Sequence, residues 1–257
     1  MIRGLYTSAL GMITHMQRMD IVTNNMANVN TTAYKRDHVV SHAFSSEFMY
    51  RLNDPGIRLF DKNWLVGQVN PGVFVDDVFT AFTQGPMQQT GNSLDLAIFG
   101  QGFFVVNVNG EELFTRDGAF TLVHGMLVTN CGGRVQGLEG DITLPNGYIA
   151  IDERGRIFVN DEHVDTLRMT AFSSDDRVTG LHSLRKMENN FYRVSDDSVQ
   201  IPFAGTLQQG FLEGSNVNIV SEMVQMITLS RAYETNARMV TIQDNTLQHA
   251  VNDIARR

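Results

Sequence analysis

The sequence predicts an α+β protein in which long helices at both ends of the chain flank an inserted all-β domain. Two observations carry this prediction. Apolar residues recur at three- and four-residue spacing in both terminal segments, which is the helical period, whereas short alternating runs separated by glycines fill the middle. We expect an N-terminal core helix over residues 1–30, an irregular connector over 31–71, the β domain over 72–214 and a C-terminal core helix over 215–257.

The N-terminal segment carries a stripe of apolar residues with heptad-like spacing. Tyr6, Ile13 and Val22 widen this stripe, whose main positions are Ile2, Leu5, Ala9, Met12, Met16, Met19 and Met26, with Thr23 between them. Such a stripe predicts an amphipathic helix whose stability depends on packing against a partner. The helix is expected to end in the tract "NNMANVNTT", because Asn and Thr side chains bond to neighbouring backbone groups and compete with the helical ladder.

The middle of the chain reads as a series of short strands. The connector shows neither period clearly, and "LNDPGIRLFDKN" within it reads as an irregular linker. Further on, "IAIDERGRIFVN" predicts a hairpin that turns around residues 153–156, and "TLRMTAF" and "NFYRVSD" predict further strands. The acidic stretch "DEHVD", residues 161–165, is expected to be a polar turn between strands.

The C-terminal segment repeats the helical rhythm over a longer stretch. Its apolar positions are Ile219, Met223, Met226, Tyr233, Ala237, Val240, Leu247, Val251 and Ile254. No Gly or Pro follows Gly214, Asn218 is a suitable N-cap, and Glu222 places a negative charge in the first turn. At 1.5 Å per residue, this helix would be roughly 50 Å long.

Each terminal helix needs a partner for its apolar face, and the natural partner is the other helix, in a coiled-coil-like core. Two helices bury one seam only, so the apolar flanks beside it call for further copies of the chain, and such heterologous contacts build a filament when they do not close. The residues expected to pack between subunits are Leu5, Met12, Met16, Met19, Asn25, Met26, Asn28, Met223, Met226, Tyr233, Val240, Leu247 and Val251. The alternative is a compact α+β monomer in which the helices fold back onto the sheet.

The sequence predicts no catalytic, cofactor-binding or metal site. His38 and His42 have the spacing of two metal ligands on a helix, but no third ligand is placed and the segment has no helical period. Cys131 is the single cysteine and has no neighbouring histidine base. The run "FGQGFF" has Val105 where a dinucleotide fingerprint has its third glycine. The acidic pairs at 76–77, 175–176 and 196–197 are expected to be solvated turns.

Composition excludes further classes of protein. The net charge of −8 argues against nucleic-acid binding, and no apolar run approaches the roughly 18 residues of a membrane span. The N-terminus has no continuous apolar region followed by a cleavage site. We therefore expect a cytoplasmic protein, or one exported without a cleaved signal peptide, that does not insert directly into a membrane.

The chain resembles the bacterial flagellar rod and hook family. The resemblance rests on "SALGMITHMQRMDIVTNNMANVNTTAYKR" at the N-terminus and "LEGSNVNIVSEMVQMITLSRAYETNARMV" at the C-terminus, with "LDLAIFGQGFFVV" and "FTRDGAFTL" between them. It covers nearly the whole chain in the family's order. The sequence departs from the family at Ala33, where relatives usually have a Gly that permits a positive φ, and this departure puts the tight turn there in question.

The resemblance implies a structural subunit, not an enzyme. It implies that the terminal helices pack in the core of a hollow axial tube that transmits torque from motor to hook, and that the termini are poorly ordered before assembly. The implied partners are copies of itself, other rod and hook proteins, and the flagellar type III export apparatus. The implied location is the basal-body rod in the cell envelope. "RAYETN" favours the distal over the proximal rod. The alternatives are a hook or other rod-like component, or a secreted β-domain hydrolase or binding module.

Overall fold

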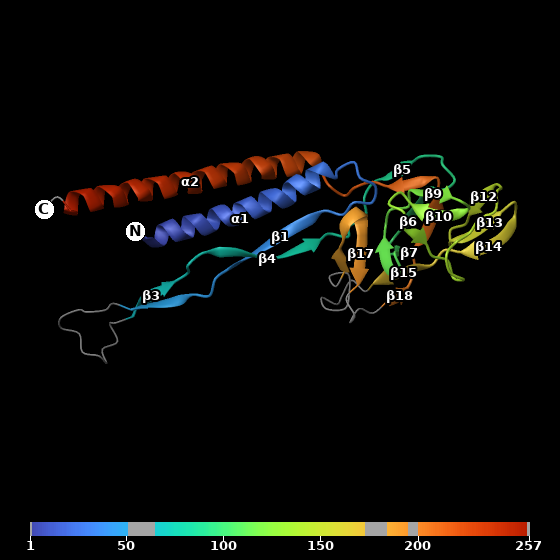
Figure 1. Ribbon diagram of the computed structural model, residues 1–257, viewed down its shortest axis with the longest axis horizontal. Helices are drawn as coiled ribbons and strands as arrows, with labels where there is room; N and C mark the ends of the chain where they lie inside the picture. Colours follow the sequence, from blue (N-terminus) through green and yellow to red (C-terminus); the bar gives the residue numbers. More distant parts are fainter. Residues whose placement is uncertain (1, 51–64, 173–183, 195–199, 256–257) are drawn as a thin grey trace. The chain divides into compact units, whose positions relative to one another are not determined.

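A computed structural model describes residues 2–50, 65–172, 184–194 and 200–255. The α+β class is confirmed: helix α1 spans Ile2–Ala27, helix α2 spans Ile219–Ala255, and the chain that connects them forms short strands (Figure 1). The chain divides into two compact units. The first unit holds residues 1–24, 37–79 and 220–257, and the second holds 25–36 and 80–219. In the described part of the chain, neither helix has the length and apolarity needed to cross a membrane.

The first unit consists of the two helices and two strand pairs. Strand β1 (Asp37–Ala43) pairs with β4 (Val73–Thr80), and β2 (Glu47–Tyr50) pairs with β3 (Leu65–Val69). The strands run beside α1, because the Thr14 hydroxyl donates to the carbonyl of Val73 at 3.1 Å and the Thr7 hydroxyl to that of Pro71 at 3.2 Å. A two-stranded ribbon is marginal alone, so packing against a helix is what stabilises it.

The segment expected to be irregular therefore contains strands. Residues 31–71 hold β1, β2 and β3. These strands were not predicted because a narrow ribbon is partly exposed on both faces, so its residues do not alternate cleanly between apolar and polar. Strand β1, for example, has no fully buried side chain. The expected linker "LNDPGIRLFDKN", residues 52–63, lies outside the described residues.

The second unit is built on a nine-stranded sheet. Its main path runs β16 (Leu184–Lys186), β17 (Phe191–Val194), β8 (Glu111–Thr115), β7 (Phe103–Val108), β11 (Arg134–Val135), β10 (Met126–Thr129) and β9 (Phe120–Val123). Strand β15 (Met169–Phe172) joins this sheet by pairing with β7, and β18 (Gln200–Pro202) pairs with β15.

Three smaller sheets complete the unit. They are β12 (Ile149–Ile151) with β13 (Arg156–Val159) and β14 (Glu162–Thr166), β19 (Thr206–Gln209) with β6 (Leu96–Phe99), and β20 (Phe211–Glu213) with β5 (Met87–Gln89). A short 3₁₀ turn spans Glu188–Asn190 before β17.

Two apolar clusters cover the two faces of the central strands. Successive side chains of a strand point to opposite faces. Phe104 and Val106 of β7 accordingly enter one cluster, and Phe103 and Val105 enter the other. All four are at most 1% exposed, which explains why "FFVV" reads as a continuous apolar run.

The strand predictions have mixed outcomes. The hairpin over 149–160 is confirmed, because β12 and β13 pair antiparallel with Ile151 opposite Ile157. The strands in "TLRMTAF" and "NFYRVSD" are confirmed as β15 and β17. The prediction of a turn over 161–165 is wrong for residues 162–165, because β14 begins at Glu162. The turn lies at Asn160 and Asp161, both at positive φ. Pairing with β13 makes this polar stretch a strand.

Candidate functional site: a buried polar junction and two exposed helix faces

The tract that follows α1 turns back on the helix end through side-chain hydrogen bonds. The helix ends at Ala27, as the Asn and Thr residues predict. The Thr31 hydroxyl lies 3.1 Å from Oδ1 of Asn28. The Tyr34 hydroxyl donates to Oδ1 of Asn25 at 3.1 Å, and both residues are buried. Asn25 thus holds the returning chain within its own subunit.

Ala33 adopts the positive-φ turn that its sequence put in question. Its φ is 53°, its side chain is 2% exposed, and its N–H donates to the carbonyl of Glu213 at 2.7 Å. The turn is therefore made without glycine. The left-handed conformation of a residue with a Cβ costs about 1–2 kcal/mol, which the surrounding contacts must offset.

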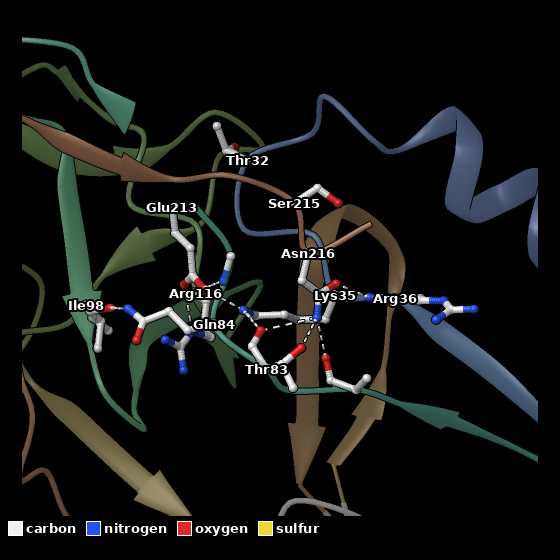
Figure 2. A network of polar contacts seen from close by, with 12 residues as sticks. Thr32, Lys35, Arg36, Thr83, Gln84, Ile98, Arg116, Glu213, Ser215 and Asn216 are labelled. Atoms are coloured by element: carbon white, nitrogen blue, oxygen red, sulfur yellow. Dashed lines mark hydrogen bonds and ion pairs between the residues drawn. The ribbon is translucent and has the colours of Figure 1, made fainter. Parts of the chain in front are cut away.

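Beyond this turn, three charged side chains meet in a dry site, shown in Figure 2. Glu213 accepts from Nζ of Lys35 at 2.6 Å and from Nε of Arg116 at 3.0 Å. The backbone N–H of Gly85 donates to the same carboxylate at 2.8 Å. The three side chains are at most 3% exposed, so water screens none of these interactions.

The remaining donors of the two cations reach backbone carbonyls. Nζ of Lys35 donates to Thr83 at 2.8 Å, and Nη2 of Arg116 donates to Gly100 at 2.9 Å. Because two cations share one carboxylate, the site carries an excess positive charge. Burial, with the Arg116 charge adding to it, lowers the pKa of Lys35 to about 8, while Glu213 opposes the shift.

Asn216 joins the same three stretches of chain by neutral hydrogen bonds. Its Oδ1 accepts from the N–H of Arg36 at 2.7 Å, and its Nδ2 donates to the carbonyl of Ala81 at 2.7 Å and to the hydroxyl of Thr83 at 2.9 Å. We call Lys35, Thr83, Arg116, Glu213 and Asn216 the polar junction. It links residues 33–36, 81–86 and 213–216 within the second unit.

The stretches that the polar junction links lie, in the sequence, next to three of the four points where the chain passes between the two units. The chain leaves or enters the second unit after residues 24, 36, 79 and 219. The three stretches that the junction links border the last three of these passages. These hydrogen bonds and ion pairs therefore tie the three stretches to one another within the second unit.

The helices present apolar faces to solvent as well as to each other. On α1 the exposed residues are Tyr6, Ile13 and Met16, and on α2 they include Val220, Met223, Val224, Ile227, Met239, Ile242 and Val251. A small pocket of about 240 Å³ is lined by Met12, Ile13, Met16 and Ala9 of α1 and Tyr233 of α2. Tyr6 and Val220 are 63% and 67% exposed.

The residues expected to pack between subunits fall into three groups. Asn25 is buried, and Met16, Met223 and Val251 are exposed. The others are partly buried: Leu5, Met12, Met19, Met26, Asn28, Met226, Tyr233, Val240 and Leu247. The structure of one chain brings Met12, Met16 and Tyr233 around one pocket, and the packing role of the whole set stays a prediction.

Sequence reasoning did not single out the polar junction. A buried lysine or glutamate gives no periodic signal, because its partners come from distant parts of the chain. One signal was available. Lys35, Arg116 and Glu213 each lie in a stretch that carries the family resemblance, namely "NNMANVNTTAYK", "FTRDGAFTL" and "LEGSNVN".

Known proteins match this chain over regions that include the same three stretches. Family models match residues 5–35 (flagella basal body rod protein), 97–159 (flagellar hook protein FlgE/F/G D1 domain) and 208–253 (flagellar basal body rod FlgEFG protein, C-terminal). The rod protein FlgG of Bacillus subtilis is 30% identical, with 98% of this chain and 99% of that protein covered. The rod protein FlgF of Caulobacter vibrioides is 34% identical, with 95% and 94% covered.

The chain belongs to the flagellar basal-body rod protein family. It is also 40% identical to the flagellar hook protein FlgE of Treponema pallidum, over 53% of this chain and 30% of that protein. Members of the rod family are structural parts of the flagellum and not enzymes, so the hydrolase alternative is excluded. No cluster of three potential metal-ligating side chains occurs in the described part of this rod-family chain, and His42 instead lies 3.5 Å from Asp76.

Proposed function

We propose that this chain is a subunit of the distal flagellar rod. It polymerises through α1 and α2, paired in a coiled-coil-like core, into a hollow axial tube that transmits torque from motor to hook. The observation that carries this proposal is the apolar outer face of each terminal helix, in a chain whose family builds the rod.

The outer faces support assembly because their exposure is unfavourable in a single chain. Val220, Val224 and Ile227 lie within two turns of α2 and are each more than half exposed. Burying apolar surface is worth about 25 cal/mol per Å², so a row of such side chains favours contact with other subunits. A contact between unlike surfaces that repeats around an axis without closing on itself produces a helical assembly.

The polar junction supports the transmission of torque. A load that passes along α2 or along the strands β1 and β4 enters the second unit through the stretches that the junction links. Buried charge-assisted hydrogen bonds have fixed geometry. When they are pulled apart, no interaction of equal strength replaces them. Glu213 and Asn216 therefore hold the stretch that precedes α2 firmly within the second unit.

The distal position and the partners belong to the same proposal. The stretch "RAYETN", residues 231–236, favours the distal rod. The subunit would contact copies of itself and other rod and hook proteins, after passage through the flagellar type III export apparatus without a cleaved signal peptide. Its location would be the rod within the cell envelope.

Electron microscopy of basal bodies from cells that lack this protein tests the proposal. We expect the axis to stop within the rod, with the proximal part present and the hook absent. A variant with Ile13→Asp and Val224→Asp, which alters only exposed helix positions, is expected to fold but to leave the same truncated axis. Tyr148→Asp, at a 74% exposed position of the second unit, is the matched control and should restore the full axis. A complete rod and hook in the deletion strain would contradict the proposal.

A further inference from the structure

The contact between α1 and α2 contains two polar side chains seated on two glycines. A Cβ placed on Gly4 would overlap the side-chain amide of Gln243, and a Cβ placed on Gly11 would lie 2.8 Å from Nδ2 of Asn236. Seven residues along α1 correspond to seven residues backwards along α2, so the helices run antiparallel, side by side, as Figure 1 shows.

The apolar residues of the two helices do not choose one register. Leu5, Met12, Met19 and Met26 repeat every seven residues on α1, and Met226, Tyr233, Val240 and Leu247 do so on α2. If one helix slides by seven residues, apolar side chains again meet apolar side chains. A seam of this kind needs an element that does not repeat in order to select one alignment.

The glycine and amide pairs supply that element. Sliding one way by seven residues leaves Gln243 over Gly11 but brings Asn236 against Arg18. Sliding the other way leaves Asn236 over Gly4 and carries Gln243 past the N-terminus of the chain. Of these three alignments, only the observed one seats both amides on residues without a side chain.

The position of Gln243 is unfavourable for its side-chain carbonyl. Its Oε1 is buried and has no hydrogen-bond partner among the described residues. A buried carbonyl without a partner destabilises the folded state, and an apolar side chain of similar size would avoid that penalty. Buried polar groups on a helix seam are best known for selecting alignment at the expense of stability.

We propose that Gly4 with Gln243 and Gly11 with Asn236 set the register of the terminal helices. This inference rests on the proposed function in one respect: the register aligns the outer faces of α1 and α2 into one surface for the next subunit. A slip by seven residues displaces one face from the other by about 10 Å, and the composite surface no longer matches.

A distance measurement between spin labels tests the register. The labels are placed at Asp20→Cys and Thr241→Cys, both exposed, with Cys131→Ser to remove the native thiol. Labelled chains are diluted with unlabelled ones in assembled filaments, so that pulsed electron paramagnetic resonance reports distances within one subunit. We expect one narrow distance in this parent, because the register is unique.

The test variant is Asn236→Leu with Gln243→Leu, and the matched control is Asn245→Leu with Gln248→Leu, at exposed positions of the same helix. We expect the test variant to gain a second distance displaced by about 10 Å and the control to keep the parent's single distance. A single unchanged distance in the test variant overturns the proposal. A broad distribution of distances in the test variant also overturns the proposal, because the amides would then hold the two helices together rather than set their register.

The two proposals fail in different ways. If the parent does not assemble, the proposed function fails, and the same comparison in the single chain still decides the register. A broad distribution of distances in the assembled parent, or in a single chain that never assembles, overturns the register proposal, since there would be no unique alignment to set.

Discussion

The two units of this chain hold their structure by different means. In the second unit, apolar side chains fill both faces of the central strands. In the first unit, Val22 is the one buried apolar side chain among those that the structure describes, although the helices are long. The apolar core of the second unit is therefore sufficient to stabilise its fold. The first unit has helices and a ribbon whose apolar surfaces remain largely in contact with water, and its stability depends on further contacts.

The largest expected effect comes from a cavity in the core of the second unit. Phe104→Ala removes a fully buried ring that packs edge-on against Phe120 with centroids 5.1 Å apart. We expect a loss of about 3–5 kcal/mol in the free energy of unfolding, measured by chemical denaturation. Ile13→Ala, at a half-exposed position of the first unit, should change the stability of the free chain by less than about 0.5 kcal/mol. Equal losses would show that the two units are stabilised alike.

The next effect comes from removing the charge of Glu213. Glu213→Gln leaves Lys35 and Arg116 buried without a compensating carboxylate, at a cost of about 3 kcal/mol. The change is measured as a shift in the denaturation midpoint of the second unit. Glu112→Gln is the control, because Glu112 forms an exposed pair with Arg168 and its loss should cost at most about 1 kcal/mol. A loss for Glu213→Gln no larger than the control's would mean that the polar junction adds little stability.

The pH dependence of stability sharpens the role of Lys35. Its folded-state pKa is about 8 against an ordinary value of 10.5, so between these pH values the unfolded chain binds a proton that the folded chain has released. Stability should therefore rise with pH across this window, by at most about 1.4 kcal/mol per pH unit from this group. Denaturation of the parent and of Lys35→Met from pH 7 to 10.5 isolates the contribution, and identical slopes in the two proteins would refute it.

The smallest expected effect concerns Ala33. Ala33→Gly relieves the positive φ of 53° but gives the unfolded chain more freedom, so the net gain in stability should be about 0.5–1 kcal/mol. Thermal unfolding measures it. Ala27→Gly, at the end of α1, is the comparison and should not stabilise. A destabilised Ala33→Gly variant would show that the turn is not strained.

Much of this fold was predictable because it depends on local patterns. The helical period placed α1 and α2 within a few residues of their observed ends, and alternation with glycine turns identified the hairpin over 149–160. The ribbon strands β1–β3 were missed because their alternation is weak. Met16, Met223 and Val251 fit the apolar rhythm yet lie exposed, since a rhythm identifies a face and not what covers it.

The sequence by itself determined the class of the fold, the family, and the apolar character of both terminal helices, because each of these depends on residues close together in the chain or on long matching stretches. Only the tertiary structure decided that Lys35, Arg116 and Glu213 meet in one dry site, that Ala33 completes a left-handed turn against Glu213, and that Gln243 and Asn236 rest on two glycines. These contacts join residues up to 239 positions apart, and no local period records such pairs.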